Sequence, residues 1–385
     1  MTEAVVDRYL RLGLQLGRHV EGIVDAYFGP SEPAAAIAAA PPVEPRTLVA
    51  DGEALLGDLE DGWLRDQVGG LRTYAGVLAG DAGSYADEVE GCYGVRPEYT
   101  SEAVFLDTHA ELDELLPGAG TLAQRYERWR TSMLVPAEQV EPTVAAVIER
   151  ARSWTRRLVD LPDGERVTLE IVRDEPWMAF CYYLGDLESR ISVNVDLPKS
   201  AAELLHLTMH ETYPGHHAER CAKEAVLVRG RGLLEETIVL VPTPQSLVSE
   251  GIAELAPALL LEGDGGAAIA EVVQDAGIEL DIAHALAVER AYQPCRWAEV
   301  NAALMLHDGG LSEAETRTYL ERWGLMDAKL SAHVLRFLRE PTSRTYILTY
   351  AAGRELCEAY VGGEPERFRR LLTEQVRVGD LLQPR

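Results

Sequence analysis

The stretch "LLHLTMHETYPGHHAER", residues 204–220, decides how this chain folds around its most chemically distinctive residues. It begins as an apolar, helix-forming run and carries His210 followed at once by Glu211, the opening pair of the H-E-x-x-H zinc motif. In that motif the second histidine comes four residues after the first, so that both lie on one helix face. Here Pro214 occupies that position. The sequence therefore indicates either a broken metal site or a metal site built on another geometry.

The next histidines along the chain, His216 and His217, cannot reach His210 on a regular helix. Position i+6 lies about 240° round the axis and about 9 Å along it, and position i+7 lies two turns away. Pro214 removes a helical hydrogen bond and opens the turn, and Gly215 accepts backbone conformations that other residues avoid. We therefore predict a broken turn that returns His216 to His210. Spacing alone leaves His217 open as the alternative ligand.

The helical run "PTPQSLVSEGIAELAPALLLEG", residues 242–263, carries two acidic side chains, Glu250 and Glu254, one turn apart in apolar surroundings. A carboxylate in such surroundings is costly unless it is paired or binds a metal. Where two histidines and one glutamate hold zinc, a further acid often orients a ligand histidine. We predict Glu250 as the third zinc ligand and Glu254 as the orienting acid. A solvated acidic helix face is the alternative.

The two motifs together, H-E-T-Y-P-G-H at 210–216 and E-G-I-A at 250–253, resemble the bacterial family known as domain of unknown function 885. The resemblance covers about residues 164–353. It implies a mainly helical zinc metallopeptidase, similar to the gluzincin carboxypeptidases and oligopeptidases. In this chain it implies zinc ligation by His210, His216 and Glu250, with Glu211 as the catalytic base.

Two positions depart from the family pattern, since Ile252 stands in place of a tryptophan and Glu219 in place of a glutamine. Both departures leave the implied ligands intact, but they put the substrate class in question.

Two tyrosines near the C-terminus, Tyr346 and Tyr350, share a helix face in "EPTSRTYILTYAAGRE", residues 340–355. The resemblance implies a Y-x-x-G element in the active site, matched here by Tyr350 and Gly353. A hydrolytic site needs a donor for the developing oxyanion, and we predict Tyr350 in that role. Spacing alone fits two core tyrosines equally well.

Other candidates for contact with a substrate rest on single features. Arg344 is a candidate for binding a substrate carboxylate, because an arginine binds carboxylates through two hydrogen bonds. An extended peptide can add to an edge strand, and we predict residues 189–197, which include Asn194, as that strand. His307 lies near a predicted helix C-terminus, where a histidine more often stabilises the helix dipole than contacts a substrate. These candidates are Arg344, Tyr346, Asn194, His307 and His217.

The pattern along the chain predicts a mainly α fold with one small sheet. Apolar residues at helical spacing run from residue 3 to a stop at Gly29-Pro30, and a long amphipathic helix ends near Pro162. From about Gly164, alternating β-branched and aromatic residues predict an antiparallel meander of about three strands directly before the metal-binding helix. We expect a helical N-terminal lobe, residues 1–163, and a catalytic lobe, residues 164–385.

Composition limits the classes of partner. The chain has 385 residues and a net charge of −27, a field that repels phosphate backbones, so we expect no nucleic-acid partner. Its five cysteines form no C-x-x-C pair, which argues against a disulfide framework and a cysteine zinc site. The first residues form no apolar leader, and no run reaches the roughly 18 apolar residues of a membrane helix. We therefore expect a cytoplasmic protein with no membrane partner.

These features predict a hydrolase with one zinc ion per chain, acting on a peptide or another amide. Two alternatives stay open. Two histidines and one carboxylate also bind the iron of non-haem Fe(II) enzymes, and a helical binding protein could carry a silent site. The hydrolase is favoured because Glu211 has a role in hydrolysis and none in the iron site. The presence of all four key residues argues against a decayed site.

Overall fold

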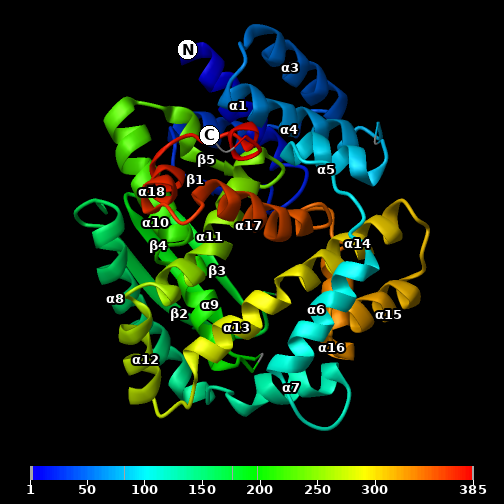
Figure 1. The fold of residues 1–385 in the computed structure, drawn as a ribbon. Helices are drawn as coiled ribbons and strands as arrows, with labels where there is room; N and C mark the ends of the chain where they lie inside the picture. The colour runs from blue at the N-terminus through cyan, green and yellow to red at the C-terminus, as the bar shows by residue number, and fades with distance from the viewer. Residues whose placement is uncertain (1–2, 82, 176, 197, 384–385) are drawn as a thin grey trace.

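Helices dominate the fold, which confirms the predicted mainly α class (Figure 1). The computed structural model describes residues 3–81, 83–175, 177–196 and 198–383. The helices are α1 (Glu3–Leu16), α2 (Ser31–Ala39), α3 (Pro45–Asp58), α4 (Trp63–Leu78), α5 (Tyr85–Tyr93), α6 (Glu102–Leu115), α7 (Leu122–Ser132), α8 (Ala137–Leu158), α9 (Ala201–Glu211), α10 (His216–Lys223), α11 (Pro244–Glu262), α12 (Gly266–Asp275), α13 (Ile282–Tyr292), α14 (Trp297–His307), α15 (Glu313–Trp323), α16 (Ala328–Phe337), α17 (Ile347–Val361), α18 (Pro365–Thr373) and α19 (Val378–Leu381). The strands are β1 (Val24–Tyr27), β2 (Arg166–Val172), β3 (Ala179–Gly185), β4 (Glu188–Asn194) and β5 (Ile238–Leu240).

Side-chain caps fix the starts of several helices. Ser101 accepts a hydrogen bond from the amide of Ala103 at the start of α6. Ser200 and Glu203 form a capping box at the start of α9, the helix that carries the metal motif. A capping box satisfies two backbone donors that a helix start leaves unpaired, so the first turn of α9 is well anchored.

The prediction of one helix from residue 3 to Gly29-Pro30 was wrong in its second half. Helix α1 ends at Leu16, and the chain then forms strand β1, antiparallel to β5. Ala26 pairs with Val239 and Tyr27 with Ile238. A strand is stabilised by its cross-strand partners. The partners of β1 lie in β5, far along the chain, so the local sequence pattern around β1 could not predict this strand.

The three-stranded sheet was predicted as an antiparallel meander with residues 189–197 at its edge, and both features were wrong. The strand order is β2-β4-β3, so β4 is central. Strand β3 joins β4 by a tight antiparallel hairpin, whereas β2 runs parallel to β4. The physical reason is that β4 bonds on both sides, which alternation cannot predict. Leu197, the last residue of that predicted edge strand, lies outside the described residues.

Helix α11 runs through the middle of the molecule and is buried along nearly its whole length (Figure 1). Its neighbours come from both halves of the chain. The largest apolar core contains side chains of α1, α3, α4 and α5 together with side chains of α11 and α17. The boundary drawn at residue 163 therefore does not separate two cores. Among the described residues, no helix is both long and apolar enough to cross a membrane.

Candidate metal centre

The turn between α9 and α10 carries the metal motif. Helix α9 ends at Glu211, and α10 begins at His216 after the Pro-Gly pair. The amide of Gly215 donates to the carbonyl oxygen of Met209 at 3.1 Å. A Cβ atom at Gly215 would lie only 1.9 Å from the carbonyl oxygen of His210. Glycine is therefore required because the two backbones touch, and this contact returns His216 to the first helix.

Three of the predicted ligands converge. The imidazoles of His210 and His216 are nearly perpendicular, with ring centroids 4.7 Å apart. Glu250 lies 3.4 Å from His210 Nε2 through one carboxylate oxygen and 3.3 Å from His216 Nε2 through the other. Ligands about 2.1 Å from a tetrahedral zinc ion are separated by about 3.4 Å. The spacing of these three side chains fits such an ion.

The polar atoms of this group also fit a cation. Glu250 Oε2 is buried and makes no hydrogen bond with the described residues. Burial alone would raise the pKa of Glu250, but the imidazoles of His216 and His210 hold it well below its usual range. A buried, ionised and incompletely bonded carboxylate beside two imidazoles is the donor set that zinc prefers.

A second group of possible ligands, His206, His210 and Glu254, adjoins the first and shares His210 with it. Glu254 Oε1 lies 3.6 Å from His210 Nδ1 and 3.5 Å from His206 Nε2, and Arg296 approaches its other oxygen at 3.5 Å. Because a guanidinium already faces this carboxylate, we assign Glu254 to orienting His210. Such outer partners fix the ring and raise its basicity as a ligand.

The other predicted ligand histidine, His216, lies beside a buried hydrogen-bond network that sets which of its ring nitrogens carries the proton. Ser249 Oγ donates to Glu219 at 2.5 Å and lies 3.3 Å from His216 Nδ1. Glu219 is ionised, because Lys223 and Arg220 overcome the effect of burial and lower its pKa to about 2. Because the hydroxyl proton of Ser249 points to Glu219, the Ser249 oxygen accepts a hydrogen bond from His216 Nδ1–H. His216 Nε2 is then free to bind a metal, and the glutamate that departs from the family pattern supports this.

Glu211, the predicted base, is buried beside the three ligands, 8% exposed. Burial raises the pKa of its carboxyl; His210 and His216 oppose this, and Glu250 and Asp25 reinforce it. Asp25 comes from β1, at the point where the register with β5 is interrupted, and sequence reasoning missed it. A raised pKa suits a carboxyl that takes up and releases a proton near neutral pH.

The two tyrosines of the C-terminal motif have different partners. Tyr346 donates a hydrogen bond to Glu250 at 2.6 Å, so it orients a predicted ligand. The ring of Tyr350 lies 5.5 Å from that of Tyr346, and the side chain is only partly buried. Its electrostatic neighbours are Glu250, Glu254 and Glu211. Tyr350 is therefore a donor available at the centre.

Helices α11 and α17 bring these tyrosines to Glu250 by touching backbone to backbone. A Cβ atom at Gly251 would lie 2.3 Å from the carbonyl oxygen of Gly353. One at Gly353 would lie 2.5 Å from the carbonyl oxygen of Leu247. The glycines of the E-G-I-A and Y-x-x-G elements therefore serve one purpose, which is the close crossing of two helices.

The remaining candidates for substrate contact have partners of their own. The amide nitrogen of Asn194 donates to the carbonyl oxygens of Glu175 and Trp177, so it braces a loop. Arg344 is hydrogen-bonded to the buried Glu88. His307 contacts the carbonyl oxygen of Leu338 at 2.8 Å and stacks on Tyr85. The groups of possible metal ligands found among the described residues include none of the three.

His217, the alternative second ligand, points away from the metal group. Its ring is fully buried and contacts Ser189 Oγ at 2.7 Å and Glu165 Oε2 at 3.2 Å. Cys221 lies 3.5 Å from His217 Nε2, so nucleophile, base and acid are in contact. However, Cys221 is 0% exposed and burial raises the pKa of its thiol. A buried, protonated thiol is inert, so this group is structural.

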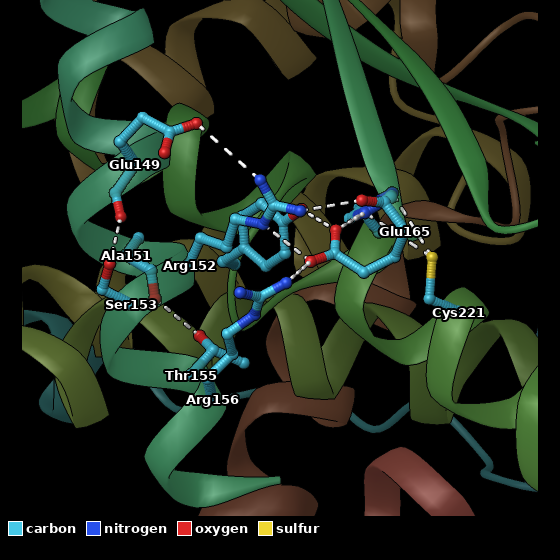
Figure 2. Close-up of polar contacts among 10 residues, drawn as sticks. Glu149, Ala151, Arg152, Ser153, Thr155, Arg156, Glu165 and Cys221 are labelled. Atoms are coloured by element: carbon cyan, nitrogen blue, oxygen red, sulfur yellow. Dashed lines mark hydrogen bonds and ion pairs between the residues drawn. The ribbon is translucent and has the colours of Figure 1, made fainter. Parts of the chain in front are cut away.

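Glu165 joins the metal turn to helix α8. Figure 2 shows Arg152 and Arg156 converging on its carboxylate, at 2.6 Å and 3.2 Å. Its other oxygen accepts from Tyr213 and contacts His217, the residues on either side of the Pro-Gly-His segment. Burial alone would raise the pKa of Glu165, but hydrogen bonds from His217, Tyr213 and Arg152 lower it to about 2. Glu165 therefore fixes both ends of the turn that delivers His216.

Replacing Glu165 by glutamine should lower the free energy of unfolding of the metal-free protein by about 2–4 kcal/mol at neutral pH, because the buried carboxylate would lose its charge in the ion pairs with Arg152 and Arg156, which are themselves partly exposed. The folded pKa lies below the usual value of 4.5, so this stabilisation is present above about pH 4.5 and is lost as the pH falls towards 2. Urea unfolding at about pH 7 and pH 3 measures it. A difference between wild type and variant that stays the same at both pH values would contradict this role.

Two contributors to the centre gave no usable signal in the sequence. Ser249 is one of two serines in a largely apolar helix, and Arg296 lies in a short 3-10 turn, Gln293–Arg296, far along the chain from the motif. Each acts through one contact with a residue of the site. Only their positions in space connect them to it.

Comparison with known proteins supports the fold alone. The chain matches no family model and no curated protein. Among solved structures it is similar to a protein from Colwellia psychrerythraea described as a "putative lipoprotein", with a TM-score of 0.55 and 16% sequence identity. The match covers 87% of this chain and 61% of that chain, so this chain spans less than two thirds of that protein's length. At this identity the similarity shows a shared architecture and no shared activity.

Proposed function

We propose that this protein is a zinc-dependent hydrolase that cleaves peptide or other amide bonds. The observation that carries the proposal is the convergence of His210, His216 and Glu250, with spacings of 3.3–3.4 Å, beside the buried carboxyl of Glu211. A purely structural metal site needs no such carboxyl, and zinc hydrolases of this ligand type use one as the base.

In this proposal each residue of the centre has a distinct catalytic role. A zinc ion held by the three ligands would supply the polarisation of a water molecule and of the substrate carbonyl. Glu211 accepts the proton of the attacking water and passes it to the leaving amine. Tyr350 donates a hydrogen bond to the carbonyl oxygen as negative charge develops there. Tyr346 and Glu254 keep Glu250 and His210 oriented.

A peptide that binds as an added strand would lie beside β3. This strand is an edge of the three-stranded sheet and packs against both α9 and α10. The strand predicted for this role, β4, is central and has no free backbone groups to offer. Strand addition takes its affinity from main-chain hydrogen bonds, so β3 is the better placed of the two.

Replacing Tyr350 by phenylalanine should lower kcat about 10²- to 10³-fold, the usual effect of removing one oxyanion donor. Zinc content and KM should change little, because the tyrosine hydroxyl contacts neither His210 nor His216. Steady-state kinetics and metal analysis measure these effects. Tyr360→Phe, a buried tyrosine on the same helix, is the matched control. An unchanged kcat would reduce Tyr350 to a packing residue.

The first experiment is metal analysis by mass spectrometry on protein purified without chelators, followed by incubation with a peptide library. We expect about one zinc per chain, its loss in His216→Ala, and new peptide termini in the wild-type digest. Iron in place of zinc would redirect the proposal to oxidation chemistry. No metal in either protein after soaking in zinc would end it.

A further inference from the structure

A cavity of about 350 Å³ adjoins the metal centre between α7, α9, α11 and α13. No pattern in the sequence marks this cavity. We call it the α9–α13 cavity, and its apolar wall includes Trp129, Leu205, Leu261, Leu286, Tyr292 and Met326. Its volume lies at the lower end of the range of about 300–1,000 Å³ found for small-ligand sites, which is room for one large side chain and its neighbours.

The cavity reaches the metal centre through two side chains. His206 and Glu254 line it. Both lie next to the imidazole of His210, and Glu254 faces its Nδ1 atom. The ring centroid of His206 lies 5.8 Å from that of His210, and Glu254 Oε1 lies 3.6 Å from His210 Nδ1. A group bound in the cavity is therefore one side chain away from a ligand of the predicted zinc ion.

The four arginines in the wall are compensated. Each of the four arginines that line the cavity has an acidic side chain beside it: Arg130 with Glu203 at 2.7 Å, Arg296 with Glu289 at 3.3 Å, Arg354 with Glu358 at 3.9 Å, and Arg290 with Glu262. Glu299 has no ion-pair partner among the described residues, but burial raises its pKa to about 7, which removes much of its charge at neutral pH. Asp327 also lines the cavity without an ion-pair partner among the described residues, but it is exposed and accepts a hydrogen bond from the amide of Leu330. An anionic ligand would lose its hydration here and gain no free counter-ion, and a cationic ligand would meet only this solvent-exposed carboxylate.

The apolar side chains of the wall, in contrast, favour the binding of an uncharged group. Leu261, Leu286, Tyr292 and Trp129 are only partly buried although they face the interior of the fold. Covering such side chains with a hydrocarbon group removes apolar surface from water, which favours binding. Of the chemical classes that the cavity can admit, an uncharged apolar group gains most.

We propose that the α9–α13 cavity is the specificity subsite of this enzyme and receives a large apolar side chain, leucine or phenylalanine, next to the bond that is cleaved. This inference rests on the proposed hydrolase function and names its substrate class.

The test uses alanine-based hexapeptides that carry a single Leu, Phe, Lys, Arg or Glu. Affinity is measured by calorimetry on the zinc-loaded Glu211→Gln protein, and cleavage by mass spectrometry on the wild type. We expect the Leu and Phe peptides to bind at least tenfold more tightly than the all-alanine peptide, and cleavage beside that residue. Equal affinities, no measurable binding, or a preference for Lys, Arg or Glu would overturn the inference.

Filling the cavity provides the second arm. Leu286→Trp should reduce the preference for Leu and Phe at least tenfold, whereas Leu106→Trp, the same change at a 58% exposed position of α6, should not. If Leu286→Trp fails to fold, Leu330→Trp at the exposed rim replaces it. A preference that survives filling would overturn the subsite. Tight, selective binding without cleavage of any peptide by wild type would instead refute the hydrolase and leave the subsite standing.

Discussion

Glu211→Gln should reduce the rate of peptide hydrolysis about 10²- to 10⁴-fold, the usual contribution of general acid–base catalysis, while zinc stays bound. The carboxyl of Glu211 is buried beside the ligands but is not one of the converging ligand atoms. Glutamine keeps its size and removes only the ability to take up a proton. The loss should therefore appear in kcat, with the zinc content unchanged.

Two variants sharpen this experiment. Glu211→Asp keeps a carboxylate at a different reach and should recover part of the activity. Glu60→Gln, at an exposed position, controls for the loss of one negative charge from a strongly acidic chain. Full activity in Glu211→Gln would remove this residue as the base. Loss of zinc together with activity would show that its role is to hold the metal.

Glu250→Ala should weaken zinc binding by more than 10²-fold. Removing an outer partner of a ligand typically costs about 10- to 100-fold in metal affinity, and Glu250 is one of the three predicted ligands in the group with His210 and His216. Its loss leaves two histidines, an incomplete set for zinc. Competition with a fluorescent chelator measures the dissociation constant, and circular dichroism checks that the variant folds.

The neighbouring acid supplies the comparison for Glu250. Glu254→Ala, one helical turn away, should weaken zinc binding by only about 10- to 100-fold, because it acts through His210. The order of the two effects is the critical result. Equal zinc affinity in Glu250→Ala and wild type would eliminate Glu250 as a ligand, and a larger loss in Glu254→Ala would favour the second group of ligands around His206.

The similarity to the Colwellia protein is informative about architecture only. A TM-score of 0.55 at 16% identity means that the chains share a fold while most side chains differ. One fold hosts many activities, so function has to be argued from the site. Here the functional proposal rests on the spacing of the three predicted ligands and on the buried carboxyl of Glu211. It rests also on the acidic groups that orient the two histidines.

Several features of this protein could be read from the sequence because their causes are local. Helical spacing predicted a mainly α fold, which the structure confirms. The Pro-Gly pair predicted a break after α9, and the break is present. Short-range sterics and capping act within a few residues, so a local pattern carries them.

Only the tertiary structure decided which strand is central, that β1 exists, and which of the two adjacent histidines faces Glu250. Strand β1 depends on β5, more than two hundred residues away, and β4 is central because β2 and β3 both bond to it. His217 turns towards Glu165, which leaves His216 for Glu250. These outcomes depend on partners brought together by the whole fold, and a one-residue choice between two histidines has no signature in their spacing.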